Sequence, residues 1–250
     1  MAEATTSMTA ARPGSFAAQP LMEIDVRSPT ALIIGASRGL GLAIAEEYLR
    51  RGWHVTGTVR RTARTALHRV ADRSKGRLAV EKVDIVKPAQ IAALRRRLAE
   101  RRFDLLFVNA GIMNDDTIAE VSTADFVRVM VTNALGPMRV VEAFEDLVKR
   151  GGTIGVMSSG LGSISWSDGY LQVYSASKAA LNMLMKGFAA RHAARTTVII
   201  APGWVRTDLG GPNAPLSIAQ SIPRVVDVIT SRTGKRGLLF LNYRGKTVPW

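Results

Sequence analysis

The sequence contains no cysteine and only three histidines among its 250 residues. Without cysteine there is neither a disulfide framework nor a thiolate metal site. The three histidines, His54, His68 and His192, lie too far apart in the sequence to predict a ligand cluster. We therefore expect no metal in this protein.

Long apolar runs are also lacking, since no stretch approaches the roughly 20 residues that cross a bilayer. Residues 1–27 have neither the basic start nor the apolar core of a secretory signal. Their alanine, threonine and proline content and their lack of periodicity predict a disordered extension, with a targeting segment or a misplaced start site as alternatives. We expect residues 28–250 to form one domain of a cytoplasmic protein that does not enter the membrane.

Acidic residues are few, 20 against 34 lysines and arginines, and the formal net charge is +14. Between Trp53 and Val80, seven basic residues accompany a single acid, Asp72. Net charge affects solubility and non-specific association rather than fold. Because no zinc finger or aromatic-rich RNA-binding motif accompanies the charge, the sequence does not favour a nucleic-acid partner.

Residues 31–41 are the most informative segment, because a short apolar strand runs into Gly35, Gly39 and Gly41 and then into a helical pattern. Glycine permits turn dihedrals closed to other residues and lets a pyrophosphate approach the backbone. The amides at the start of the helix favour negative charge. The G-x-x-x-G-x-G spacing differs from the commoner G-x-G-x-x-G, and by itself it also fits an ordinary glycine-rich turn.

Strands and helices alternate along the rest of the chain. Strands are predicted at residues 31–34, 53–59, 78–84, 103–109, 153–157, 197–201 and 238–241. Helices are predicted at residues 40–51, 88–101, 122–149 and 173–192, the third starting at a capping box of Ser122 and Asp125. This alternation predicts a Rossmann-type α/β fold, a doubly wound, seven-stranded and mostly parallel sheet with helices on both faces. Ligands then bind beyond the carboxyl ends of the strands.

Tyr174 and Lys178 stand four residues apart and share one face of a predicted helix. A phenol has a pKa of about 10, and we expect the neighbouring ammonium to lower it, making the pair a usable acid and base. Reduction of a carbonyl builds negative charge on oxygen, so a serine hydroxyl is expected as a second hydrogen-bond donor. Ser159 and Ser158 both end a predicted strand and point in opposite directions, and the residues alone leave this choice open.

The end of the second strand indicates which cofactor binds. Folds that bind NAD place an acid about 20 residues after the glycines, where it binds the ribose hydroxyls. Here that position is Arg60, and no acid occurs from Trp53 to Ala71. Arg38 and Arg60 supply planar donors for a 2′-phosphate, so the sequence predicts NADP(H), although these arginines also fit an ordinary surface.

Five motifs, taken in order, resemble those of the short-chain dehydrogenases/reductases. They are Gly35-Ala36-Ser37-Arg38-Gly39-Leu40-Gly41, Asn109-Ala110-Gly111, Asn133, Ser159 and Tyr174-Ser175-Ala176-Ser177-Lys178. The resemblance covers residue 30 to the end. Residues 202–212 and the closing Val248-Pro249-Trp250 resemble the branch of sniffer-type carbonyl reductases and C-factor-like proteins.

This resemblance implies an NADP(H)-dependent oxidoreductase that transfers hydride between the cofactor and a small-molecule carbonyl or alcohol, and that forms a homodimer or homotetramer. A C-factor-like signalling or regulatory protein with incidental turnover is the alternative. The resemblance implies catalytic roles for Asn133, Ser159, Tyr174 and Lys178, and it favours Ser159 over Ser158. It places Asn133 in a water relay. The other interpretation of Asn133 is an ordinary helix kink before Gly136-Pro137. Cofactor contacts are implied for Gly35, Ser37, Arg38, Gly39, Leu40, Gly41, Arg60, Asp84, Ile85, Asn109, Ala110, Gly111, Tyr174, Lys178, Pro202, Gly203, Val205 and Thr207.

Two features depart from the family pattern. Ile34 stands where many relatives have threonine, which removes a side-chain hydrogen bond that braces the glycine turn. Fourteen residues separate Ser159 from Tyr174, more than in many relatives. We expect this longer segment to form part of an apolar or aromatic substrate wall with Trp166, Tyr170 and Trp204, although ordinary loop packing also explains these aromatics.

Overall fold

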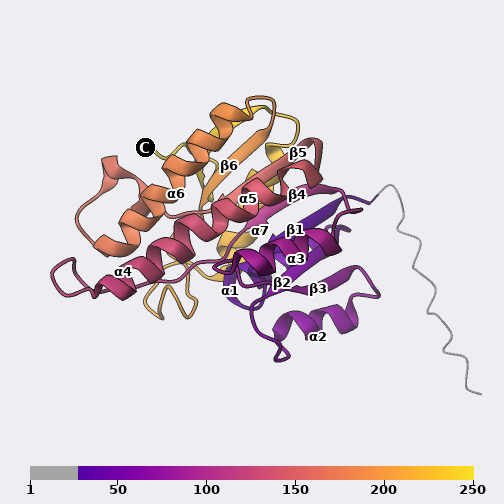
Figure 1. Ribbon diagram of the computed structural model, residues 1–250, viewed down its shortest axis with the longest axis horizontal. Coiled ribbons are helices and arrows are strands. Elements are labelled where there is room, and N and C mark those ends of the chain that lie inside the picture. Colours follow the sequence, from indigo (N-terminus) through magenta and orange to yellow (C-terminus); the bar gives the residue numbers. More distant parts are fainter. Residues whose placement is uncertain (1–27) are drawn as a thin grey trace, which may run out of the picture.

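The computed structural model describes residues 28–250, and the expectation for residues 1–27 lies outside the described residues. A single sheet of seven parallel strands forms its centre (Figure 1). The strands are β1 (Thr30–Ile34), β2 (His54–Val59), β3 (Leu78–Lys82), β4 (Phe103–Val108), β5 (Val148–Met157), β6 (Thr196–Ala201) and β7 (Gly237–Asn242). The predicted Rossmann-type fold is confirmed.

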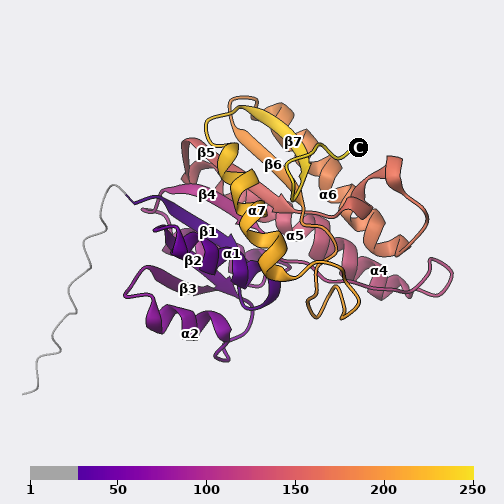
Figure 2. The same ribbon diagram turned by 180° about the vertical axis from the view of Figure 1, so that it is seen from behind.

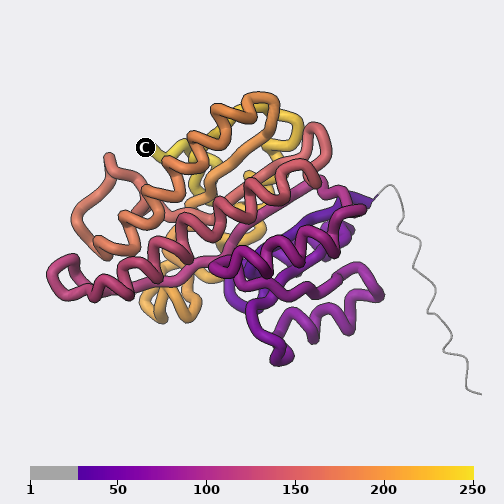
Figure 3. The backbone as a smooth tube through the Cα atoms, in the orientation of Figure 1, coloured from indigo at the N-terminus to yellow at the C-terminus, as the bar shows by residue number. Residues whose placement is uncertain are grey.

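The strand order is β3-β2-β1-β4-β5-β6-β7, so the direction of winding reverses between β1 and β4. Leu32 pairs with Thr56 of β2 on one side and with Leu106 of β4 on the other. A crevice opens at such a reversal because the connections from the two neighbouring strands leave in opposite directions. Figure 3 follows the chain from β1 outward to β3 and back through β4 to β7.

Helices cover both faces of the sheet. They are α1 (Gly39–Arg50), α2 (Ala66–Arg73), α3 (Pro88–Arg97), α4 (Thr123–Met130), α5 (Gly136–Phe144), α6 (Gln172–Arg191) and α7 (Ile218–Ser231). The apolar cluster on one face contains residues of α3, α5 and α6, and the cluster on the other contains residues of α1, α2 and α7. Figures 1 and 2 show these two layers from opposite sides. No helix within residues 28–250 has the length and apolar character needed to span a membrane.

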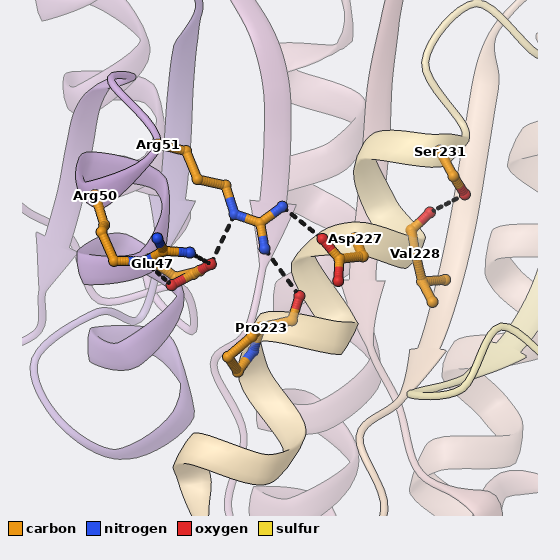
Figure 4. Close-up of polar contacts among 7 residues, drawn as sticks. All are labelled: Glu47, Arg50, Arg51, Pro223, Asp227, Val228 and Ser231. Carbon is orange, nitrogen blue, oxygen red and sulfur yellow. Dashed lines mark hydrogen bonds and ion pairs between the residues drawn. The ribbon is translucent and has the colours of Figure 1, made fainter.

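Polar contacts join α1 to α7 beside the sheet (Figure 4). Arg51 donates to Glu47 at 2.7 Å, to Asp227 at 2.7 Å and to the carbonyl of Pro223 at 3.1 Å. Glu47 is mostly buried, and its hydrogen bonds to Arg50 and Arg51 lower its pKa against the opposing effect of burial. This network fixes the first helix, whose N-terminus faces the crevice, against the last one.

The structure corrects the long helix predicted from Ser122 to Lys149. Ser122 does accept a hydrogen bond from the amide of Asp125, but the helix ends at Phe144 and the strand begins at Val148. A π-turn, η1 (Val131–Leu135), interrupts it. Pro137 has no N–H to donate to the carbonyl four residues earlier, which accounts for a local break in the α-helical bonding.

Two helices that the sequence interpretation did not name are present. In the short α2 only Leu67 is fully buried, but Leu67, Val70 and Ala71 recur at helical spacing and pack on one apolar cluster, a signal that the sequence interpretation missed. The amphipathic α7 contains Pro223, a residue that normally indicates a helix boundary. Tertiary packing onto the sheet supplies most of the stability of such segments.

Candidate functional site

A cleft of about 1660 Å³ lies at the carboxyl ends of the strands. Its lining comes from the segments that follow strands β1 to β6, from α4 and from the start of α6. Parallel strands end at one edge of the sheet, so residues far apart in sequence meet there. The volume is large enough for a dinucleotide together with a small substrate.

The glycine-rich turn forms the floor of this cleft between β1 and α1. Gly35 has a φ of 85°, a conformation that favours glycine, and a methyl group on it would lie 2.9 Å from the backbone of Ala110. The amide of Gly35 donates to Oγ1 of Thr58 at 2.9 Å, and its carbonyl accepts from Nδ2 of Asn109 at 3.1 Å. Thr58 on β2 therefore supplies the brace that Ile34 does not provide.

Gly41, one of the expected cofactor contacts, does not itself line the cleft. It is buried in α1, and a methyl group on it would lie 2.1 Å from the carbonyl oxygen of Gly35. This glycine permits close packing of the helix against the turn. Its effect on any ligand is therefore indirect, through the shape of the phosphate cradle.

Arg38 and Arg60 both line the end of the cleft beside β1 and β2, and both are exposed. Arg38 forms an ion pair with Asp208, which lies in the loop after β6. The sequence interpretation did not single out Asp208, because nothing in its local pattern indicates a contact with the glycine turn. No Asp or Glu follows β2 before α2.

Tyr174 lies in the first turn of α6 and is almost fully buried. Leu171, just before the helix, has a φ of 49°, a left-handed conformation that sets the direction in which α6 begins. Burial raises the pKa of the Tyr174 phenol to about 12, and a hydrogen bond with the hydroxyl of Ser159 opposes this rise. The expected lowering of this pKa by Lys178 is therefore wrong in sign for the described structure, because desolvation dominates.

Ser158 and Ser159 have different surroundings although they are consecutive. The hydroxyl of Ser158 is buried and donates to Oδ1 of Asn182 at 2.7 Å, on the body of α6. Ser159 is partly exposed, and its hydroxyl faces Tyr174 and accepts from the amide of Leu161 at 3.2 Å. The structure thus brings Ser159, and not Ser158, to the phenol.

Lys178 lies one turn after Tyr174, with its ammonium 5.7 Å from the centre of the phenol ring. The ammonium donates to the carbonyl of Met157 at 3.1 Å. Burial lowers the pKa of Lys178 to about 8. The group still carries its charge at neutral pH, inside the cleft and next to the end of β5.

Asn133 lies in η1 and does not line the cleft. Its side chain accepts from the amide of Ile112 at 2.8 Å and donates to the carbonyl of the same residue at 2.8 Å. A methyl group on Gly111 would lie 3.3 Å from the ammonium of Lys178 and 3.4 Å from Oδ1 of Asn133. Asn133 thus holds the segment after β4 close to Lys178.

The remaining predicted residues line the cleft together. These are Gly35, Ser37, Arg38, Gly39, Leu40, Arg60, Asp84, Ile85, Asn109, Ala110, Gly111, Ser159, Tyr174, Lys178, Pro202, Gly203, Val205 and Thr207. Beyond Tyr174 the lining becomes apolar and aromatic. Met113, Val127, Trp166, Tyr170, Leu171, Trp204 and Leu209 lie there. Only the three aromatics of this second group were expected from the sequence.

The residues around the glycine-rich turn, the phosphate cradle, indicate whether a dinucleotide fits. Glycines at 35 and 111 leave space where a side chain would meet Ala110 or Lys178, and both border the cleft. The amides of Gly39 and Leu40 belong to the first turn of α1, whose partial positive charge favours phosphate. These residues fit a pyrophosphate. No cluster of three or more metal-ligating side chains occurs within residues 28–250.

The fold and this cradle define a nucleotide-binding α/β protein of the oxidoreductase type. The family model described as short chain dehydrogenase matches residues 29–215, and the chain belongs to that family. This result confirms the resemblance stated from the five motifs.

This chain is similar to three proteins of known name, among others. A short-chain dehydrogenase/reductase from Burkholderia multivorans, crystallised with bound NADP, is 56% identical with a TM-score of 0.88, covering 89% of this chain and 100% of that one. A carbonyl reductase from Pseudomonas aeruginosa PAO1 in complex with NADP is 34% identical with a TM-score of 0.82 and the same coverage. The C-signal protein of Myxococcus xanthus is 35% identical over 153 residues, 59% of this chain and 92% of that protein.

Proposed function

We propose that this protein is an NADP(H)-dependent oxidoreductase that reduces a small or lipophilic carbonyl, or oxidises the matching alcohol. The observation that carries the proposal is the meeting of Tyr174, Ser159 and Lys178 at one wall of a cleft whose floor is a glycine cradle. The NADP in the Burkholderia multivorans and Pseudomonas aeruginosa structures supports the choice of cofactor.

The chain's residues divide among four parts of the cofactor. The amides of residues 37–40 hold the pyrophosphate, and Arg38 and Arg60 hold the 2′-phosphate. Asp84 and residues 109–111 hold the adenosine end, while Lys178 and residues 202–207 hold the nicotinamide end, as in the family. The bound cofactor supplies the hydride.

Tyr174 donates the proton that the carbonyl oxygen gains. Its raised pKa keeps the phenol protonated at neutral pH, so the donor is in the correct state. Ser159 donates a second hydrogen bond to the developing negative charge. The charge of Lys178 and the N-terminal end of α6 both favour the phenolate that remains after transfer. Asn133 acts as a positioning residue through Ile112.

The deciding experiment compares the parent protein with Tyr174→Phe. Consumption of NADPH with a panel of aldehydes and ketones should fall by roughly 10²–10⁴-fold, the range for loss of a positioned general acid. Thermal stabilisation by NADPH should remain near that of the parent, because the ring is kept. Turnover by Tyr174→Phe equal to that of the parent would contradict this mechanism and favour a cofactor-binding regulatory role.

A further inference from the structure

The indole of Trp166 stands at the substrate side of the cleft, next to the reacting groups. It belongs to the short 3-10 turn η4 (Ile164–Trp166) and is 52% exposed. A methyl group on Gly160 would lie 3.9 Å from the indole, and Gly160 directly follows Ser159. Any displacement of this turn would therefore change the space beside the reacting carbonyl.

The turn receives little support from α6 behind it. A hollow of about 240 Å³ separates residues 163–170 from the outer side of the helix, and Ser175, Ala176 and Ala179 line its helical side. The buried hydroxyl of Ser163 borders this hollow and has no hydrogen-bond partner within residues 28–250. Packing against the helix does not by itself fix the position of η4.

The support comes from the other end of the chain. The amide of Ser165 donates to the main-chain oxygen of Trp250 at 3.1 Å, and the hydroxyl of Ser165 donates to the same oxygen at 2.7 Å. Across the described chain, these are the only hydrogen bonds that link residues 164–169 to a distant segment. The contact spans 85 positions of sequence.

Trp250 is itself held by the body of the protein. Its ring lies 5.8 Å from that of Phe240 on β7, and the ammonium of Lys186 on α6 lies 5.3 Å from its centre. The amide of Val248, which is fully buried, donates to the carbonyl of Phe240 at 2.8 Å. Figures 1 and 2 both place the end marked C beside α6.

We propose that Trp250 and Ser165 are positioning residues that set substrate specificity by fixing Trp166 against the cleft. The inference rests on the proposed carbonyl reduction, whose substrate side it extends to a second segment of the chain. The sheet edge at β7 thus fixes one wall of the substrate pocket. Loss of this contact lets η4 move into the hollow, which widens the pocket and weakens the grip on a large aromatic substrate.

The test compares a bulky aromatic aldehyde, 2-naphthaldehyde, with a small one, propanal. Ser165→Ala removes the hydroxyl donor, and Trp250→Ala removes the ring that holds the main-chain acceptor in place. Each should raise KM for 2-naphthaldehyde by about three- to tenfold, the change expected for the net contribution of one hydrogen bond. KM for propanal, kcat and the affinity for NADPH should stay within about twofold, because the reacting groups do not move. Trp250→Phe, which keeps an aromatic ring against Phe240, should restore most of the parent value.

The matched control is Ser167→Ala, which removes a hydroxyl from the same loop that does not bond to Trp250. The double variant Ser165→Ala/Trp250→Ala should be less affected than the sum of the two single variants, because both changes weaken the same contact. Equal KM ratios in Ser165→Ala, Trp250→Ala and Ser167→Ala would overturn the proposal.

A second readout separates this proposal from the carbonyl reduction on which it rests. Hydrogen exchange of the amides in residues 163–169 should increase by about three- to tenfold in Trp250→Ala and stay unchanged in Ser167→Ala. Unchanged hydrogen exchange in Trp250→Ala would overturn the proposal that Trp250 holds η4 in place, whatever the substrate. A parent protein that reduces no carbonyl would count against the proposed function. The hydrogen-exchange comparison would still decide whether Trp250 holds η4 in place.

Discussion

Arg38 and Asp208 form an ion pair that joins the glycine-rich turn after β1 to the loop after β6. Both side chains are well exposed, so the pair contributes little to stability. The ion pair also affects cofactor binding in the proposed function, because both residues line the cleft. The guanidinium proposed to hold a 2′-phosphate is occupied by a carboxylate of the chain itself.

Cofactor preference follows from the two arginines at this end of the cleft. NADPH should raise Tm more than NADH does at equal concentration, because each charge-assisted hydrogen bond contributes roughly 1.5–3 kcal/mol before screening. Arg60→Asp should reverse the order by repelling the phosphate and accepting from a ribose hydroxyl. Arg61→Asp is the control, since Arg61 is exposed but does not line the cleft. Equal stabilisation of the parent by both cofactors would exclude NADP(H) preference.

Asp208→Asn should increase the affinity for NADPH by about two- to fivefold and leave that for NADH unchanged. The substitution frees Arg38 and removes a negative charge from the neighbourhood of the phosphate. Titration of each cofactor by fluorescence measures both affinities. Asp168→Asn is the control, because Asp168 is an exposed loop carboxylate outside the cleft. A weaker affinity for NADPH would mean that Asp208 assists binding instead.

The two adjacent serines should separate activity from stability. Ser159→Ala should lower kcat by about 10²-fold with little change in unfolding free energy, since it removes a donor to the developing charge. Ser158→Ala should do the reverse, costing about 1–3 kcal/mol of stability by leaving the buried Oδ1 of Asn182 without its partner. Urea unfolding and steady-state kinetics on both variants test this division. Equal loss of activity in both would contradict it.

Lys178 should make the protein more stable as the pH rises from about 8 toward 10.5. In that range the unfolded lysine still binds a proton, whereas the folded one, with its pKa lowered to about 8, has lost it. Stability rises with pH wherever the unfolded state binds more protons, here by up to about 3 kcal/mol.

Lys178→Met should remove this rise, and Lys235→Met, at an exposed site, should keep it. Urea unfolding at a series of pH values from about 7 to 9 tests the difference below the range in which the tyrosines of the unfolded chain titrate. A parallel pH dependence in the parent and Lys178→Met would show that Lys178 does not titrate with a lowered pKa.

We propose that the protein assembles as a homodimer or homotetramer through the outer faces of α4 and α6. Met138, Val140, Val141, Leu181 and Met185 are buried within the chain, but Met183 is 68% and Leu184 45% exposed. Met183→Glu should therefore shift the mass measured by light scattering toward 27.0 kDa. Thr62→Glu, an exposed change far from these helices, should leave the mass unchanged. A parent protein of 27.0 kDa at micromolar concentration would contradict the assembly.

The sequence by itself predicted the alternation of strands and helices and most of the residues that line the cleft. Buried parallel strands are short apolar runs, and turns that approach a phosphate need glycine, so both leave local patterns. The spacing of Tyr174 and Lys178 fixed their shared helix face in the same way. Around Pro223 in α7 the local signals contradicted each other and the interpretation failed. The helix α2 was missed although Leu67, Val70 and Ala71 recur at helical spacing.

Only the tertiary structure decided what each group touches. Burial reversed the expected sign of the Tyr174 pKa shift, because desolvation depends on atoms brought from other segments. The choice between Ser158 and Ser159 depended on Asn182, and the brace of the glycine turn came from Thr58. The contacts of Arg38 with Asp208 and of Ser165 with Trp250 join residues 170 and 85 positions apart. Local sequence carries no record of such pairs, since the path of the folded chain alone brings them together.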